Sequence, residues 1–350
     1  MNADPLADIL SLARWAPSGD NTQPWRFERR GPLEVAVHCR DTRDHVVYDL
    51  RGHASQVSYG ALLETMAIAA TAHQLRPVVK RGGSEQEPVF EVRFDADPAL
   101  ARSPLIDFIE QRSVQRRPLS RQPLLPEHRQ ALEAALGPGY TLQWLEGPAR
   151  AVAARLMYRN ARVRLTMPEA FTVHRDIIDW DNLRSKDKVP AGALGVDAIT
   201  VKLMRWGMHS WERMRRMNAL MGTWAPRLQM DLLPGLACAA HYVLRAAQPP
   251  QGIDDYVDAG RAVQRLWLTL TSLGLMMQPE LTPLIFSAYL RDGVRFTTEL
   301  AVVAEAEALR HDLRQLLGGE VERAVYMGRV GYGTASESRS IRRDLQDLMR

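Results

Sequence analysis

The stretch Ala13-Arg-Trp-Ala-Pro-Ser-Gly-Asp-Asn-Thr-Gln-Pro-Trp-Arg-Phe27 decides how the rest of this chain is interpreted. It ends an apolar helical segment, breaks at Pro17-Ser18-Gly19 and resumes at Pro24-Trp25 as a segment expected to be extended. The hydroxyl and amide groups between the two prolines are better explained as contacts to a flat, half-polar ring of a ligand than as residues that only form a turn. The simpler alternative is a helix that ends at Gly19, followed by a turn, with Trp25 in the core.

Composition is typical of a soluble globular protein. The chain has 350 residues, of which 46% are hydrophobic and 25% charged, enough for one large domain or two smaller ones. The longest apolar run, Leu266–Met277, is too short to span a bilayer, and the N-terminus lacks the pattern of a signal peptide. Cys39 and Cys238 fit no metal or redox spacing, so we expect reduced thiols and a cytoplasmic location. The net charge of +4, without a long basic block, does not favour nucleic acid.

Two segments of equal length have similar sequence patterns. Residues 60–75 and 260–275 have a similar apolar register at helical spacing, and a proline follows each of them, Pro77 and Pro279. Both are apolar almost all round, which predicts two helices buried at the centre of the molecule. The alternative is a coincidental likeness between two buried helices.

The residues Pro17-Ser-x-x-Asn-x-Gln-Pro-Trp25 resemble the signature of the FMN-dependent nitroreductase family, with six specified positions in order and spacing. Ile109–Pro118 resembles the Arg/Ser start of the same family, but no second Asn-x-Gln-Pro-Trp loop follows it. In that family two subunits build each flavin site together, one supplying each motif. The chain therefore resembles such a dimer fused into one polypeptide, as in the double-length Acg-type subgroup.

This resemblance covers residues 4–100 and 104–348, and it implies an architecture. We expect an α+β, nitroreductase-like fold, internally duplicated, with antiparallel sheets flanked by helices. The first half would span 1–103 and the second 104–350, with a helical insertion at about 160–235. Because the fused halves replace the usual dimer, we expect a monomer with one complete FMN site.

The resemblance also implies a set of cofactor-binding residues. Arg112 and Arg116, four apart on an expected helix, would share one face toward the FMN phosphate, although Gln111 and Gln115 replace arginines of the family; a solvated basic turn is the alternative. The C-terminal arginines follow an expected strand at 324–332 and match part of a second phosphate clamp. The expected residues are Pro17, Ser18, Gly19, Asn21 and Gln23 in the loop, Arg112, Ser113 and Arg116, Gly274, Pro279 and Glu280 at the ring edge, and Arg342 and Arg343.

The segment 200–234 matches the family least. Its Met and Trp residues recur at helical spacing with Arg between them. This pattern allows three interpretations: an amphipathic helix packed on the body of the protein, a cap over the flavin with Trp206 and Trp211 on its underside, or a helix on a membrane surface. The cluster of His174, Asp176, Asp179 and Asp181 lacks metal-ligand spacing, and we interpret it as a solvated loop or helix cap.

The resemblance implies an FMN-dependent oxidoreductase. NAD(P)H would pass hydride to FMN, and a small electron-poor acceptor of the nitroaromatic or quinone type would take it. Because the flavin supplies the chemistry, no catalytic side chain is assigned, and we expect no metal, nucleic-acid or membrane partner. The alternatives are an FMN-binding, sequestering protein with a lid and little turnover, and a specialised biosynthetic flavoenzyme acting on a peptide or on flavin.

Overall fold

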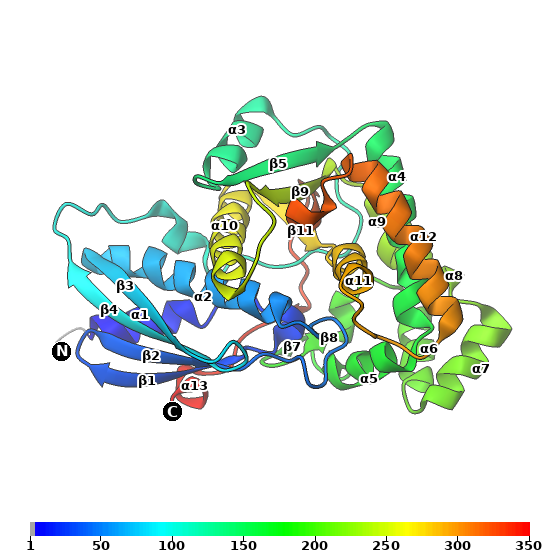
Figure 1. Ribbon diagram of the computed structural model, residues 1–350, viewed down its shortest axis with the longest axis horizontal. Coiled ribbons are helices and arrows are strands. Elements are labelled where there is room, and N and C mark those ends of the chain that lie inside the picture. The colour runs from blue at the N-terminus through cyan, green and yellow to red at the C-terminus, as the bar shows by residue number, and fades with distance from the viewer. Residues whose placement is uncertain (1–3) are drawn as a thin grey trace.

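The computed structural model describes residues 4–350 as two four-stranded antiparallel sheets with helices between and around them (Figure 1). The first sheet has the order β1-β2-β4-β3, with strands Trp25–Gly31, Glu34–Cys39, Pro88–Ala96 and Leu75–Gly83. The second has the order β10-β11-β9-β5, with strands Leu275–Pro279, Ala324–Tyr332, Ala240–Ala246 and Tyr140–Leu145. The predicted α+β class with antiparallel sheets is confirmed.

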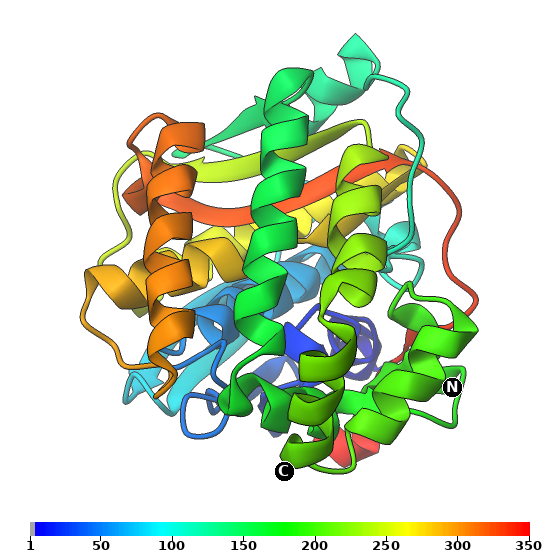
Figure 2. The ribbon, with the colours of Figure 1, turned by 90° about the vertical axis from the view of Figure 1, so that its right-hand side faces the viewer.

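Helices cover the sheets in layers. One face of the first sheet packs on α1 (Pro5–Ala13) and α2 (His53–Ala70), and one face of the second on α3 (Pro126–Ala134) and α10 (Ile253–Ser272). The other face of the second sheet is covered by α4 (Pro148–Leu165), α11 (Thr282–Arg291) and α12 (Leu300–Leu317) (Figure 2). The pair α2 and α10 therefore lies between the two sheets, as the apolar periodicity predicts.

The contact between α2 and α10 is reciprocal. A Cβ on Gly60 would lie 1.8 Å from the carbonyl oxygen of Val257, and a Cβ on Gly260 would lie 2.0 Å from the carbonyl oxygen of Val57. Only glycine allows the two backbones to approach this closely. In an interface with two-fold symmetry each contact occurs twice, because residue i of one half contacts residue j of the other and residue j of the first half contacts residue i of the second. The expected internal duplication stays a prediction, and these contacts agree with it.

A smaller helical layer closes one side of the molecule. It contains α5 (Pro168–Ile177), α6 (Ala198–Gly207), α7 (Trp211–Met221), α8 (Trp224–Arg227) and α9 (Leu233–Leu236), with one π-helical turn at Leu228–Leu232. Within this layer β6 (Ile178–Asp179) pairs in parallel with β8 (Val189–Pro190), and a second short parallel pair, β7 (Arg184–Ser185) with β12 (Arg339–Ser340), joins the layer to the C-terminal segment. No helix within residues 4–350 is both long and apolar enough to cross a membrane.

The C-terminal segment returns to the first sheet. After β12 it runs beside the loop at Asn21 and ends in α13 (Leu345–Leu348), where the Arg350 amide donates to the carbonyl of Phe27 at 2.7 Å. Both ends of the described chain therefore lie near β1 (Figure 1). This return brings residues 338–342 beside 17–21, although more than 300 positions separate them in sequence.

The expected helix through Arg112 and Arg116 is wrong. A short 3-10 turn at Pro104–Phe108 ends before it, and Val114 instead bridges to Met277 beside the second sheet. Since Pro118 disfavours helical backbone at the residue before it, the chain continues extended. Extended backbone still directs both arginines to the site described next.

Candidate cofactor site

The loop at 17–23 has an unusual backbone. Asp20, Asn21 and Gln23 have φ of +51°, +63° and +50°, a region that non-glycine residues adopt at a cost of about 1–2 kcal/mol each. Side-chain hydrogen bonds hold this conformation: the Asn21 amide donates to the carbonyl of Ile341 at 3.1 Å, and the Gln23 amide donates to that of Lys186 at 2.8 Å. These two amides anchor the loop, which leaves Pro17–Asp20 free to line a cavity.

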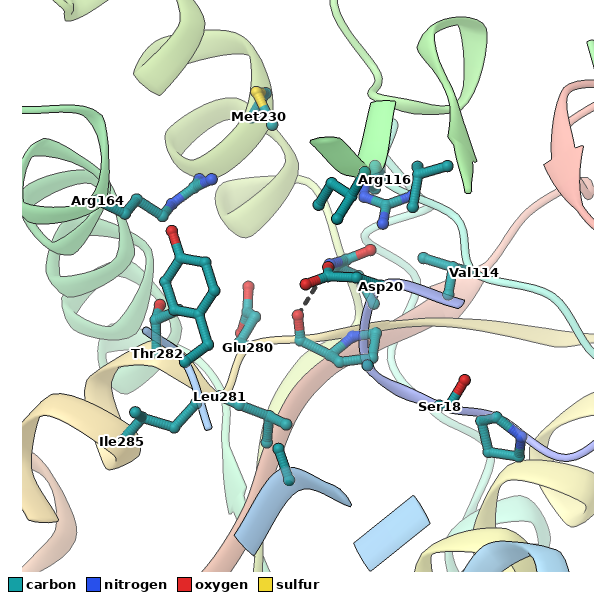
Figure 3. A pocket seen from close by; sticks show the side chains of 18 of the residues that line it. Ser18, Asp20, Val114, Arg116, Arg164, Met230, Glu280, Leu281, Thr282 and Ile285 are labelled. Carbon is teal, nitrogen blue, oxygen red and sulfur yellow. Dashed lines mark hydrogen bonds between the residues drawn. The ribbon is translucent and has the colours of Figure 1, made fainter. Parts of the chain in front are cut away.

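The larger of two adjoining cavities has a volume of about 330 Å³. Its walls come from the loop 17–20, from α2 and α10, and from α4, α5 and the helical layer (Figure 3). Apolar groups dominate the wall, with Pro17, Val114, Trp267 and Pro279 among them. A mainly apolar cavity of this size with a few polar groups is typical of a site for a ring-shaped ligand.

The smaller cavity, about 90 Å³, is basic. It shares Pro17, Ser18 and Trp267 with the larger one, so the two are continuous. Its charged wall contains Arg112 and Arg342, which are 4% and 7% exposed, together with Arg339 and Arg116. Arg112 stacks on the ring of Trp267 at 4.4 Å and donates to the carbonyl of Trp15 at 3.0 Å.

The buried Arg112 and Arg342 and the half-buried Arg339 lack the carboxylates that normally accompany such groups. Within residues 4–350, Arg112, Arg339 and Arg342 form no ion pair, and the buried Nε atoms of Arg112 and Arg339 have no hydrogen-bond partner. Burial, and then the charge of Arg339, lowers the pKa of Arg112 to about 9; burial likewise places that of Arg342 well below its usual value. Unpaired buried guanidinium groups are expensive unless an anion joins them. The donor set therefore fits a phosphate.

At the junction of the two cavities Asp20 faces Arg116 (Figure 3). Burial raises the pKa of Asp20 to about 6 against the attraction of Arg116, and burial lowers the pKa of Arg116 to about 10. Both groups are charged at pH 7, and their charges offset each other.

A fully buried ion triad lies behind the wall of the larger cavity. The Glu280 carboxylate is 2.6 Å from His241 Nδ1 and accepts from Arg329 at 2.8 Å. Burial acts against the charged forms, but Glu280 raises the pKa of His241 to about 10, and His241 and Arg329 lower that of Glu280. Glu280 therefore belongs to an internal network as well as to the cavity wall.

Other parts of the wall, among them α5 and the π-helical turn, also contribute polar side chains. The Tyr48 hydroxyl lies 2.8 Å from His174 Nε2, and Arg164 donates to both carboxylate oxygens of Asp231 at 2.9 and 2.8 Å. Burial and then Arg164 lower the pKa of His174 to about 3, so its ring is neutral at pH 7. The interpretation of His174 as part of a solvated loop or cap is wrong, because α5 directs it into the cavity. Among the described residues no cluster of His, Cys, Asp and Glu has metal-binding geometry.

The structure brings most of the expected cofactor residues together. Those that line one or both cavities are Pro17, Ser18, Gly19, Asn21, Arg112, Ser113, Arg116, Pro279, Glu280 and Arg342. Three do not. Gln23 is fully buried and accepts from the Arg343 amide, Arg343 pairs with Asp187 at 3.3 Å, and Gly274 ends α10 with φ +70°.

No motif pointed to Asp20, Arg339 or the Arg164–Asp231 pair. Asp20 is an unspecified position of the loop motif, and Arg339 reaches the site only through the C-terminal return. The segment 200–234 also lines the cavity, but through Met204, Met230 and Asp231. Trp206 and Trp211 do not line it: Trp206 is 50% exposed, and Trp211 packs on Phe171. The expected tryptophan underside is therefore wrong.

No protein-family model matches this chain, and no curated protein matches it in sequence. Two bacterial proteins are among the solved structures to which this chain is similar. One is the nitroreductase-like family protein from Bacillus cereus, 12% identical, which covers 71% of this chain and 95% of that chain with a TM-score of 0.35. The other is the FMN-dependent nitroreductase NfnB from Mycobacterium smegmatis, in complex with NADPH, 17% identical, with 69% and 95% covered and a TM-score of 0.37.

Proposed function

We propose that this chain is an FMN-dependent oxidoreductase that passes hydride from NAD(P)H to a small electron-poor acceptor of the nitroaromatic or quinone type. The observation that supports it best is the continuity of two cavities with opposite character. One is mainly apolar and large enough for a ring; the other is basic and holds the buried Arg112 and Arg342 and the half-buried Arg339, none of which has a carboxylate partner within residues 4–350. Few ligands other than a phosphorylated ring compound satisfy both.

In this proposal Arg112, Arg339 and Arg342 hold the phosphate, with the Ser113 hydroxyl beside them. Pro17, Val114, Trp267 and Pro279 enclose the ring and exclude water from it. FMN, when bound, supplies hydride acceptance and donation. The protein contributes binding, orientation and charge.

The way the site is assembled within residues 4–350 also supports a stoichiometry of one FMN per chain. The loop 17–20, the segment 112–116 and the C-terminal residues 338–342 meet once. We therefore expect one FMN per chain and a monomer in which both halves contribute to the site. Two FMN per chain, or FAD in its place, would contradict the assignment of the two cavities.

A second function, FMN sequestration with little turnover, is favoured by the hydrogen bonds that hold the helical layer to the rest of the protein. Arg164 holds Asp231 through two hydrogen bonds, and Arg329 donates to the carbonyl of Met230 at 3.5 Å. Met204 and Met230 then cover the cavity from that side. A cavity covered in this way protects a bound ring and hinders the stacking of a nicotinamide on it.

One experiment separates the two functions. The protein is reconstituted with FMN, desalted and mixed anaerobically with NADH or NADPH while flavin absorbance is followed. Rapid bleaching, and its reversal by a nitroaromatic or quinone, supports the oxidoreductase. Tight FMN binding without bleaching by either nucleotide supports sequestration, and failure to bind FMN refutes both.

A further inference from the structure

The ion triad is built from three elements that meet behind the larger cavity. His241 lies on β9, Arg329 on β11, and Glu280 directly after β10. Their side chains are 0%, 2% and 1% exposed, so water does not screen their charges. Glu280 and Arg329 line the cavity, and His241 stands behind them.

The net charge of the triad follows from geometry alone. His241 Nε2 lies 2.9 Å from the carbonyl oxygen of Gly235, which can only accept, so Nε2 carries a hydrogen. The 2.6 Å between Nδ1 and the Glu280 carboxylate requires a second proton between those atoms. Wherever that proton resides, His241 and Glu280 together are neutral, and Arg329 adds one positive charge.

No other group on the wall removes this charge. Asp20 offsets Arg116, Asp231 offsets Arg164, and His174 is neutral. Taken with the triad, the ionisable groups that line the cavity within residues 4–350 sum to +1. A buried unit charge in a region of low dielectric acts strongly on anything beside it.

We propose that the triad of His241, Glu280 and Arg329 raises the reduction potential of the flavin by favouring its anionic reduced form; this rests on the proposed function. Hydride transfer moves two electrons and one proton from NAD(P)H, which leaves as NAD(P)⁺, so the reduced flavin carries one more negative charge than the oxidised one at neutral pH. A fixed positive charge binds the reduced form more tightly. None of the three residues donates a proton or an electron; they set the field at the ring.

Three substitutions distinguish the effect of the triad's net charge on the potential from the effect of disturbing its contacts. His241→Gln and Arg329→Gln each leave a triad of zero net charge. Glu280→Gln alters the same network, but without the carboxylate the imidazole loses its Nδ1 proton and Arg329 keeps the net charge at +1. We expect the first two to weaken the preference for reduced over oxidised FMN about tenfold, a potential about 30 mV more negative. We expect Glu280→Gln to leave the potential unchanged.

The potential is measured by anaerobic equilibration of each FMN-loaded protein with a reference dye, with melting temperature and FMN content as controls. Equal shifts of the potential in all three variants would overturn the inference, and so would the absence of a shift in His241→Gln and Arg329→Gln. Either result would leave FMN binding, and with it the proposed function, intact.

A wild-type protein that binds no FMN overturns the proposed function itself. A measurement without variants covers the case in which they fail to fold: reduced wild-type protein should keep its flavin anionic well below the pH at which free reduced FMN takes up a proton, and protonation at the pH of free FMN overturns the inference.

Discussion

Arg112→Met tests whether the basic cavity is an anion site or part of the protein's own framework. Arg112 is 4% exposed and contacts no carboxylate in the described chain. Its partners are the carbonyl of Trp15 at 3.0 Å and the ring of Trp267 at 4.4 Å. Methionine has a similar length and keeps the apolar contact, so the substitution removes mainly the charge.

Two effects of opposite sign are expected. Burial lowers the pKa of Arg112 from its usual value to about 9, which corresponds to an unfavourable free energy on the order of 5 kcal/mol for keeping the guanidinium charged in the flavin-free protein. The lost hydrogen bond to Trp15 offsets about 1 kcal/mol of this. Arg112→Met should therefore raise the free energy of unfolding of flavin-free protein by a few kcal/mol. A charge-assisted hydrogen bond to phosphate contributes about 1.5–3 kcal/mol, so FMN affinity should fall roughly ten- to a hundredfold.

Chemical unfolding of flavin-free protein and fluorescence titration with FMN measure the two effects on the same samples. Arg343→Met is the matched control, because the Arg343 side chain is 33% exposed, lies outside both cavities and pairs with Asp187. It should leave FMN affinity unchanged. The reasoning is refuted if Arg112→Met destabilises the flavin-free protein without weakening FMN binding, or if both variants weaken it equally.

Further outcomes are expected at other positions. Gly260→Ala places a Cβ 2.0 Å from a backbone carbonyl of α2 and should destabilise the protein by about 2–3 kcal/mol in thermal unfolding, whereas Gly252→Ala, with nothing within 4 Å, should change little. Trp206→Ala removes a side chain that is 50% exposed and should leave the rate of flavin reduction by NADPH unchanged in stopped-flow mixing; Met230→Ala opens the cavity wall and should raise it. Folding raises the pKa of Asp20 from 3.8 to about 6, so wild-type stability should fall as pH rises through that window, and Asp20→Asn should lack this loss in unfolding measured at several pH values.

The parts of the fold that sequence predicted well depend on local pattern. The two central helices begin before the compared segments and end before them, at Ala70 and Ser272, because Leu75 and Leu275 already start strands β3 and β10. The strand expected at 324–332 has those bounds as β11. The extended start at Trp25 is also confirmed, as β1. Hydrophobic periodicity and proline positions are properties of neighbouring residues, which is why they could be read without the structure.

The parts that sequence missed depend on contacts between distant segments. Arg112 and Arg116 have helical spacing, yet backbone pairing with β10 keeps them extended. Arg339 acquires its place only because the chain returns to the first sheet, and His174 faces the cavity because of how α5 packs. A motif can indicate which residue types a site needs, but not which distant residues the fold adds to it.

In the proposed function, the arginines of the smaller cavity set the affinity for FMN and the ion triad sets its reduction potential. Substitutions can therefore test the two roles separately. If FMN binds as proposed, the arginines of the smaller cavity contact its phosphate, whose charge is the same before and after electron transfer, so Arg112→Met should weaken the binding of oxidised and reduced FMN alike and leave the potential unchanged. The triad borders the larger cavity, where the proposed flavin ring would gain negative charge on reduction, so His241→Gln should alter the ratio of the two affinities. If Arg112→Met moved the potential as far as His241→Gln does, the field at the ring would come from the whole basic cluster, and the distinct role of the triad would be lost.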